Sequence, residues 1–336
     1  MSSVSIIVPC RNEALHIDAF CESLRAQQLD ACQIVDVIVA DGMSNDGTRE
    51  RLADWQSLWK SLRVIDNHRH IVSAGLNLAI ARARGEFVIR MDVHTMYDPT
   101  YVSECVRVLR ETGANCVGGA WRPLEESGLQ QAIALAFKSP FGSGGALSRR
   151  ADYSGPVDTV YLGAWRRDEL VRLGGFDESL VRNQDDELNL RIARSGGVIW
   201  QSSRIRSSYA PRASLRALFF QFYQYGYWKV AVIAKHGWPA SPRHLAPFGL
   251  VAAVALLGLM SPLAYPARIG VSLLIMVYVS AVLVAAWAAG EPRTVLNVAR
   301  ALICMHWGYG VGFARGLIDF LLFRRPPSET NTRLTR

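Results

Sequence analysis

Short apolar runs alternate with segments of helical spacing through the first 120 residues, and this alternation limits the fold more than any other feature. The runs are β-branched and nearly continuous in apolar character, which is typical of strands buried on both faces. Strands of this kind, separated by helices, predict a parallel sheet covered by helices on both sides. The expected strands are 4–9, 34–40, 62–67 and 86–91, and the expected helices are 14–28, 47–59 and 74–84.

Beyond residue 100 the alternation becomes less regular. A helix is expected at 101–112, a strand at 114–121, and a helix at 185–197 whose acidic start and Gly-Gly end match helix-terminus preferences. The stretch "SPFGSGGALSRRADYSGP" (139–156) is rich in Gly, Ser and Arg without periodicity, so we expect a mobile loop there. In parallel sheets ligands bind beyond the carboxyl ends of the strands, which makes the polar residues after each strand the first site candidates.

Two long apolar runs change the character of the chain after residue 247. The stretches 248–266 and 269–290 contain no acidic residue and have the composition of membrane spans, although the first is shorter and carries Pro262. A soluble core hairpin is the alternative. A third segment, 295–323, contains several ionisable residues, which makes an interfacial amphipathic helix as reasonable as a third span.

The formal net charge of +8 helps to choose a topology. A hairpin of two spans leaves nearly all flanking lysines and arginines on the cytosolic side, whereas a third span would export the Arg-rich tail at 326–336. The same distribution speaks against nucleic acid as the partner that explains the charge. The N-terminus lacks a basic region and meets Pro9 too early for a secretory signal, so we expect the N-terminal domain in the cytosol.

Polar clusters follow the first and second expected strands. They are "PCRNE" (9–13) and "ADGMSNDGT" (40–48), and a parallel sheet presents them side by side. Asp41 can accept a hydrogen bond from a base N–H or a ribose hydroxyl, and Glu13 can do so from the opposite side. Alone, the second cluster would be an ordinary strand-to-helix connection. Its place beside the first favours a nucleotide, and the lack of GxGxxG argues against a Rossmann dehydrogenase.

A third polar pair, Asp92 and His94 in "EFVIRMDVHTMYDP", follows the fourth expected strand. With the two clusters, "GGFDESL" (174–180) and "NQDDELNLRIARSGG" (183–197), it resembles the inverting glycosyltransferases of the large GT-A family 2, over about residues 4–230. Within that family, "SPFGSGG", "VDTVYLGAWRR", "RNQDDELN" and "QFYQYGYWK" look most like glucosyltransferases of succinoglycan-type exopolysaccharide synthesis. The resemblance implies a UDP-sugar donor and an α/β GT-A fold (nucleotide-diphospho-sugar transferase). This is a Rossmann-like, mostly parallel sheet with helices on both faces, followed here by C-terminal membrane helices.

The Asp92-Val93-His94 stretch stands where the family has its DxD metal motif, with His94 in place of the second carboxylate. On an extended segment, residues i and i+2 face the same side, toward one ion. The resemblance implies that His94 binds the divalent metal bridging the donor diphosphate, and that Asp92 reaches the ribose or the metal's water shell. Both are assigned to the metal site. Imidazole suits Mn²⁺ better than Mg²⁺, which prefers oxygen ligands, so we expect Mn²⁺ to be preferred.

Asp185 aligns with the aspartate of the family's ED motif, which removes the acceptor hydroxyl's proton as that oxygen attacks the anomeric carbon. Gln184 departs from the family's Glu, so any role of that Glu does not carry over. The like charges of Asp186 and Glu187 would raise the pKa of Asp185 and the helix N-terminus would lower it, and the sequence leaves the outcome open. Further residues assigned to substrate binding are Pro9, Arg11, Asn77 and Asp186.

The segment "QFYQYGYWK" (221–229) resembles the acceptor-side QxxRW motif of related synthases, with Gln224 where Arg is usual. Gln221, Gln224 and Trp228 are assigned to the acceptor, Trp228 as a platform for stacking on a sugar. A helix packed at the membrane interface is the alternative reading of these aromatics. Arg149, Arg150 and the Gly-rich loop before them are expected to close over the diphosphate when the donor binds.

The sequence therefore predicts a metal-dependent inverting hexosyltransferase anchored in the inner membrane, with its catalytic domain facing the cytosol. It would move a hexose, glucose by resemblance, from a UDP-sugar to a polyprenyl-linked saccharide, with membrane lipid and other polysaccharide-assembly proteins as further partners. The predicted division is a catalytic domain at 1–235, membrane-anchoring helices at 236–325 and the basic tail. Two alternatives stay open: a transferase that uses polyprenyl phosphate directly, and a catalytically inert scaffold of a polysaccharide export complex.

Overall fold

The computed structural model describes residues 1–124 and 128–332, which divide into two compact units. The first unit comprises Met1–Pro123 and Arg150–Ala210, and the second comprises Leu124–Arg149 and Pro211–Arg336. These units differ from the predicted division at residue 235, which concerns catalytic and membrane functions and stays a prediction. The last four residues of the predicted basic tail, 333–336, lie outside the described part of the chain.

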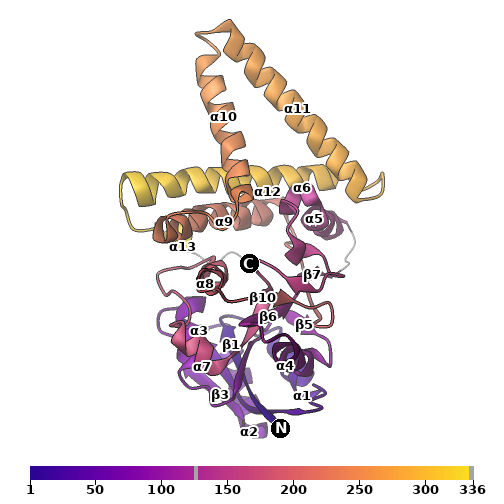
Figure 1. The fold of residues 1–336 in the computed structure, drawn as a ribbon, viewed down its shortest axis with the longest axis vertical. Helices are drawn as coiled ribbons and strands as arrows, with labels where there is room; N and C mark the ends of the chain where they lie inside the picture. The colour runs from indigo at the N-terminus through magenta and orange to yellow at the C-terminus, as the bar shows by residue number, and fades with distance from the viewer. Residues whose placement is uncertain (125–127, 333–336) are drawn as a thin grey trace. The chain divides into compact units, whose positions relative to one another are not determined.

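An eight-stranded sheet forms the centre of the first unit (Figure 1). Its strands are β1 (Ser2–Cys10), β2 (Cys32–Asp41), β3 (Leu62–Asp66), β4 (Phe87–Arg90), β6 (Cys116–Gly119), β8 (Gly155–Pro156), β9 (Tyr161–Arg166) and β10 (Ile199–Gln201). The strand order is β3-β2-β1-β4-β9-β6-β10-β8, in which β1 is parallel to β2 and β4, β2 to β3, and β6 to β10. β9 runs antiparallel to β4 and β6. The predicted mostly parallel sheet is therefore confirmed.

Helices cover both faces of this sheet, as the apolar strands predict. Along β1 the side chains alternate, so that Ile6 and Val8 pack in one buried cluster and Ile7 in the other. The first cluster is covered by α1 (Ile17–Arg25), α2 (Thr48–Leu58) and α4 (Tyr101–Thr112), and the second by α3 (Val72–Ile80), α7 (Arg167–Arg172) and α8 (Gln184–Arg194). A smaller sheet has the order β5-β11-β7, with β5 (Thr95–Tyr97), β11 (Ser207–Tyr209) and β7 (Arg122–Pro123).

The segment 139–156, expected to be a mobile loop, contains regular structure. Ser139 caps the short helix α6 (Pro140–Ser143) by accepting a hydrogen bond from the backbone N–H of Phe141 at 3.3 Å. A 3₁₀ turn follows at Leu147–Arg149, and β8 ends the segment. The expectation was wrong because serine followed by proline is a helix-start signal that a Gly-rich composition hides.

The second unit consists of helices. They are α5 (Leu129–Lys138), α6, α9 (Leu215–His236), α10 (Ala246–Met260), α11 (Tyr265–Ala289), α12 (Val295–Gly316), a π-helical end at Leu317–Leu322 and α13 (Glu329–Thr332), with a 3₁₀ turn at Pro242–Leu245 before α10. Within this unit α10 and α11 form a hairpin (Figure 1). By length and composition, Pro242–Met260 and Tyr265–Ala289 could each cross a membrane.

The third C-terminal segment packs along α9 instead of extending beside the hairpin. Gly308, Gly312 and Gly316 recur every four residues on α12 and lie against backbone carbonyls of α9. A Cβ added at Gly312 would stand 1.9 Å from the carbonyl oxygen of Tyr223, far inside van der Waals contact. Small residues at this spacing let two helix backbones approach closely. This glycine seam therefore joins α9 and α12 into one layer.

Candidate active site

The loops that follow β1 and β2 are fastened together at the carboxyl edge of the sheet. The backbone N–H of Asn12 donates to Ser44 Oγ at 2.8 Å, and that of Glu13 donates to Thr48 Oγ1 at 2.7 Å. Asn12 and Met43 have φ values of 54° and 57°, a left-handed conformation that non-glycine residues seldom adopt and that tends to occur at functional sites. The two polar clusters are thus side by side, as predicted.

Asp41 ends β2 as a fully buried carboxylate. Its Oδ2 accepts hydrogen bonds from Arg49 at 2.8 Å and from the backbone N–H of Ser44 at 3.1 Å, and its Oδ1 accepts from the Ser44 hydroxyl at 2.5 Å. Arg49 also binds Asp66, at the end of β3, at 2.8 Å. Both oxygens of Asp41 are thus engaged within the protein. Its role toward a base or ribose stays a prediction, and it would require an exchange of these bonds.

Asn77 holds the turn that contains the "GGFDE" sequence. Its Oδ1 accepts from the backbone N–H of Phe176 at 2.8 Å, and its Nδ2 donates to the Phe176 carbonyl and to Glu178 Oε1, both at 2.8 Å. Arg11 lies over Gly42, where an added Cβ would stand 3.1 Å from Arg11 Cδ. The substrate roles of these residues and of Pro9 stay predictions.

The DVH motif at 92–94 forms a turn, and our expectation of an extended segment was wrong. The backbone N–H of Thr95 donates to the Asp92 carbonyl at 3.1 Å, which closes the turn, so the alternation of an extended chain does not apply. Asp92 accepts from Arg90 through both carboxylate oxygens, at 2.9 and 3.0 Å. The Tyr97 hydroxyl fixes the backbone of Asp92, accepting from its N–H at 2.6 Å and donating to its carbonyl at 3.0 Å.

Arg90 is a site residue that we did not predict from the sequence. Its side chain is 9% exposed, and its guanidinium interacts electrostatically with Asp185 as well as with Asp92. Burial alone would lower the pKa of Arg90, but these two carboxylates raise it and keep the group charged. The available signal was a charged side chain within the apolar run "EFVIRM", because buried charges need partners.

Asp185 lies in the first turn of α8. Asn183, two residues before it, has a φ of 60°, and Asp185 Oδ1 accepts from the backbone N–H of Asp186 at 3.0 Å. Burial raises the pKa of Asp185, the charge of Asp186 raises it further, and Arg90 offsets part of this rise. The question that the sequence left open is thus answered: the like charge and burial outweigh the helix N-terminus.

Glu187, the third acid of this turn, has a structural partner. It is fully buried and forms an ion pair with Arg191, four residues later, at 2.8 Å. Arg191 also donates to the Gly175 carbonyl at 2.6 Å. The "GGFDE" turn is therefore held by α8 as well as by α3.

His94 is the side chain of the DVH turn best placed to meet a metal. Its side chain is 37% exposed, its Nδ1 lies 3.0 Å from Glu13 Oε1, and its ring packs edge-on against Tyr209 with centroids 5.4 Å apart. Across residues 1–124 and 128–332, no group of three or more His, Cys, Asp or Glu could hold an ion. The motif thus offers at most His94 and Asp92. One imidazole and one carboxylate fit an ion that takes its other ligands from diphosphate and water.

The predicted acceptor residues lie on α9 in the second unit. Gln221 donates to the Tyr225 hydroxyl at 3.0 Å, and Gln224 is buried. Trp228 is 2% exposed, and its Nε1–H donates to the carbonyl of Asn331, in the C-terminal segment, at 3.0 Å. The indole thus packs as a core side chain with no open face for a sugar. Acceptor roles for these residues stay predictions.

Arg149 and Arg150, expected to close over a diphosphate, belong to different units. Arg149 lies over the ring of Phe137, 5.5 Å from its centroid, within the second unit. In the first unit, Arg150 forms an exposed ion pair with Asp152 at 3.2 Å. Their closing role stays a prediction.

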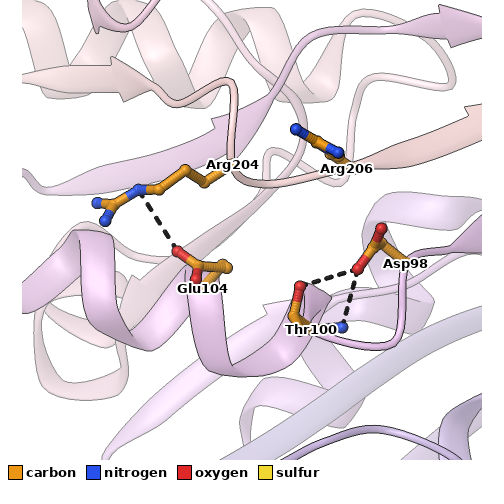
Figure 2. A pocket seen from close by; sticks show the side chains of 5 residues that line it. All are labelled: Asp98, Thr100, Glu104, Arg204 and Arg206. Atoms are coloured by element: carbon orange, nitrogen blue, oxygen red, sulfur yellow. Dashed lines mark hydrogen bonds and ion pairs between the residues drawn. The ribbon is translucent and has the colours of Figure 1, made fainter.

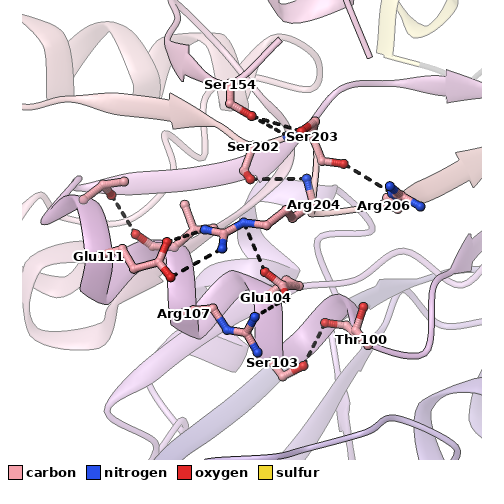
Figure 3. Close-up of polar contacts among 12 residues, drawn as sticks. Thr100, Ser103, Glu104, Arg107, Glu111, Ser154, Ser202, Ser203, Arg204 and Arg206 are labelled. Atoms are coloured by element: carbon pink, nitrogen blue, oxygen red, sulfur yellow. Dashed lines mark hydrogen bonds and ion pairs between the residues drawn. The ribbon is translucent and has the colours of Figure 1, made fainter. Parts of the chain in front are cut away.

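A cavity of about 190 Å³ lies on the first unit (Figure 2). It is lined by Asp98, Thr100, Glu104, Arg204 and Arg206. Asp98 accepts from the backbone N–H and hydroxyl of Thr100, at 3.1 and 2.8 Å, and Arg204 pairs with Glu104 at 3.5 Å. Figure 3 shows that Arg204 also reaches Glu111 of α4. These contacts attach the chain before β11 to α4, and we assign no ligand to this cavity.

A known protein family matches the part of the chain that carries these motifs. The model of glycosyl transferase family 2 matches residues 5–169, which contain both polar clusters and the DVH turn. The chain is 31% identical over 336 residues to the succinoglycan biosynthesis protein ExoA of Rhizobium meliloti (strain 1021), covering 95% of this chain and 96% of that protein.

A more distant relative comes from an archaeon. It is the dolichyl N-acetyl-alpha-D-glucosaminyl phosphate 3-beta-D-2,3-diacetamido-2,3-dideoxy-beta-D-glucuronosyltransferase of Methanococcus voltae. The identity is 24% over 247 residues, covering 70% of this chain and 75% of that protein.

Among solved structures, the chain resembles the mannosyltransferase PcManGT from Pyrobaculum calidifontis, determined in complex with GDP-Man and Mn²⁺. The TM-score is 0.63 at 22% identity, and the match covers 94% of this chain and 87% of that one. A likeness at this identity concerns the fold, and the predicted GT-A class is confirmed.

Proposed function

The chain belongs to glycosyl transferase family 2, and on that premise we propose that it moves a hexose from a UDP-sugar to a polyprenyl-linked oligosaccharide. Its class, a glycosyltransferase of exopolysaccharide synthesis, follows from the family and from the relative named for succinoglycan biosynthesis. Glucose as the hexose is supported by the resemblance to succinoglycan-type glucosyltransferases. A lipid-linked acceptor is supported by the name of the Methanococcus relative, which includes a dolichyl-linked sugar phosphate.

One observation carries the proposal: Arg90 interacts with both Asp92 and Asp185. Asp92 belongs to the proposed metal and nucleotide motif, and Asp185 is the proposed base, 93 positions later in the sequence. The fold thus gathers both around one buried cation. A donor bound at the carboxyl edge of β1, β2 and β4 would present its anomeric carbon near Asp185.

Asp185 acts as the base in the proposed reaction. The acceptor hydroxyl gives its proton to the Asp185 carboxylate as its oxygen forms a bond to the anomeric carbon. The bond from that carbon to the diphosphate oxygen breaks in the same step, and UDP leaves with the electron pair. A single displacement inverts the anomeric centre, so an α-linked donor gives a β-linked product.

The raised pKa of Asp185 suits this role, because a base whose pKa lies nearer to the working pH accepts a proton more readily. Arg90 limits this increase in the pKa of Asp185 and so favours the ionised carboxylate that the reaction needs.

His94 and Asp92 would hold the divalent cation, with Mn²⁺ preferred over Mg²⁺. When bound, such a cation offsets the charge that develops on the leaving diphosphate. His94 would supply a nitrogen ligand from Nε2, which makes no hydrogen bond in the described part of the chain. The bidentate contact with Arg90 neutralises Asp92, so the motif presents less negative charge than two carboxylates would. The nitrogen ligand, and not the charge, supports Mn²⁺ over Mg²⁺, which prefers oxygen ligands.

The α10–α11 hairpin would anchor the enzyme in the inner membrane. The 18-residue apolar windows of its two helices are 0% and 11% buried, so most of their apolar side chains are exposed and would contact lipid. Because α12 packs along α9, we favour two spans and a surface helix, with the catalytic unit in the cytosol. Labelling of single cysteines placed near Ser261 and Glu291 in intact spheroplasts would test this: only the Ser261 position should react from outside.

The acceptor is tested by supplying purified enzyme with radiolabelled UDP-glucose and one of two lipids. We expect label to enter a polyprenyl-diphosphate-linked oligosaccharide and not polyprenyl phosphate. Transfer to polyprenyl phosphate alone would replace the proposal with the direct lipid transferase. Nucleotide binding without transfer from UDP-glucose or other nucleotide sugars to either lipid would favour the inert scaffold.

A further inference from the structure

Glu13 and His94 form a pair that joins two loops far apart in the sequence. Glu13 follows β1, is 4% exposed, and places Oε1 3.0 Å from Nδ1 of His94 in the DVH turn. The backbone of Glu13 is fixed by its hydrogen bond to Thr48 Oγ1. A buried and anchored carboxylate therefore contacts Nδ1 of His94.

This contact decides what the histidine can do. A neutral imidazole has one nitrogen that donates and one that accepts. If Nδ1–H donates to the Glu13 carboxylate, the lone pair lies on Nε2. The edge-on contact with Tyr209 restricts the ring further. Carboxylates that accept a hydrogen bond from a metal-binding histidine fix its tautomer and orientation and increase its basicity.

Asp92 has a different partner in this structure. Both of its oxygens accept from Arg90, at 2.9 and 3.0 Å, and the turn gives Asp92 and His94 separate partners. Glu13 is the carboxylate that the structure places on His94. Its burial also makes a direct contact with a nucleotide, the role we first expected for it, less accessible.

We propose that Glu13 is a positioning residue that holds the His94 ring with Nε2 directed toward a divalent cation. The proposal rests on the metal role of His94 proposed above. It explains how a motif with one histidine in place of a carboxylate can retain a metal. The second carboxylate, that of Glu13, contacts the histidine ring and not the metal. The carboxylate stabilises the ligand without occupying a coordination position.

The test measures Mn²⁺ binding by electron paramagnetic resonance in the full-length protein in detergent. Titrations are made with saturating UDP, with a protein-free Mn²⁺–UDP series as baseline. The variants are Glu13→Gln, His94→Ala and the double variant, with Glu22→Gln on the exposed surface of α1 as the matched control. Thermal unfolding and UDP binding in EDTA show whether each variant is folded.

We expect Glu13→Gln to weaken Mn²⁺ binding about 10- to 100-fold, the range for loss of an outer-shell partner, while UDP binding in EDTA stays within twofold. Glu22→Gln should match the wild type. The double variant should bind no more weakly than His94→Ala, because Glu13 acts through His94.

Three results would overturn the inference. Wild-type Mn²⁺ affinity in Glu13→Gln, with binding lost in His94→Ala, would leave the metal role of His94 intact and remove that of Glu13. Wild-type affinity in His94→Ala would instead reject the metal role itself. Additive losses in the double variant would show that Glu13 acts independently of His94, which also contradicts the proposal.

Discussion

Replacing Arg90 with methionine should both destabilise the first unit and change its chemistry. The guanidinium makes two hydrogen bonds to Asp92, and the two side chains are 9% and 14% exposed. Breaking a buried ion pair by removing one partner costs about 3–5 kcal/mol, since the other charge is left unpaired. Because water can still reach part of Asp92, we expect the lower end, about 3 kcal/mol. For a unit of this size that corresponds to a decrease in Tm of roughly 6–12 °C.

Differential scanning fluorimetry of the detergent-solubilised protein measures this loss. The matched control is the double variant Arg90→Met with Asp92→Asn. It also removes the unpaired negative charge of Asp92 and should reverse most of the decrease in Tm. Arg90→Lys keeps the charge with a single contact and should fall between the wild type and Arg90→Met. A Tm for Arg90→Met within 2 °C of the wild type, or no recovery in the double variant, would refute the reasoning.

The same substitution has a functional readout. Arg90 lowers the pKa of Asp185 against the opposing effects of burial and Asp186. Without the guanidinium that pKa should rise, so the acid limb of the kcat–pH profile should move to higher pH in Arg90→Met but not in Arg90→Lys. An unchanged acid limb in Arg90→Met would show that Arg90 does not act on the base.

Three further predictions concern single positions. Because the pKa of the Asp185 carboxyl is raised in the folded state, the native protein binds the carboxyl proton more tightly than the unfolded chain does, and stability falls as the pH rises through the folded-state pKa. Asp185→Asn should therefore raise Tm at pH 7 but not at pH 3. Equal Tm values for the variant and the wild type at pH 7 would contradict this. Gly312→Val places atoms against the Tyr223 carbonyl and should lower the free energy of unfolding by about 1–3 kcal/mol or more. At the control position Gly249 an added Cβ would have nothing within 4 Å, so Gly249→Ala should leave the free energy of unfolding unchanged. Equal Tm values for the two variants would argue against the glycine seam. Arg204→Met removes an exposed ion pair with Glu111 and a second pair with the largely buried Glu104, which keeps its pair with Arg107 at 2.9 Å. The free energy of unfolding should therefore change by less than about 1 kcal/mol, and transfer rates should stay unchanged. A large loss of activity would give the cavity at Arg204 a function.

The sheet could be predicted because its signal is periodic. Apolar strands and helices alternate in the first 120 residues, and each strand end is marked by polar residues, so both the layers and the edge that carries the clusters follow from local pattern. The DVH turn could not be predicted in the same way. Three residues after a strand carry no periodicity, and the turn is set by the Tyr97 hydroxyl and the Thr95 N–H.

The sequence also did not show which side chains contact one another. Glu13 and His94 lie 81 residues apart, and Trp228 and Asn331 lie 103 apart, so neither contact leaves a local trace in the sequence. Glu13 was therefore assigned to the nucleotide from its place after the first strand, and Trp228 to a sugar from the resemblance of its segment to an acceptor-side motif. Arg90 is different, because an arginine inside an apolar strand signals a buried partner even where the partner is unknown.

The measurement that tests the central claim most directly is UDP release from UDP-glucose by the detergent-purified protein with Mn²⁺, with and without a lipid extract as acceptor source. Wild type is compared with Asp185→Asn and His94→Ala. We predict lipid-dependent release by the wild type, and a loss of at least about 100-fold in Asp185→Asn, as expected when a general base is removed. His94→Ala should also lose activity. Release by Asp185→Asn at the wild-type rate would contradict the assignment of the base, and with it the proposed mechanism.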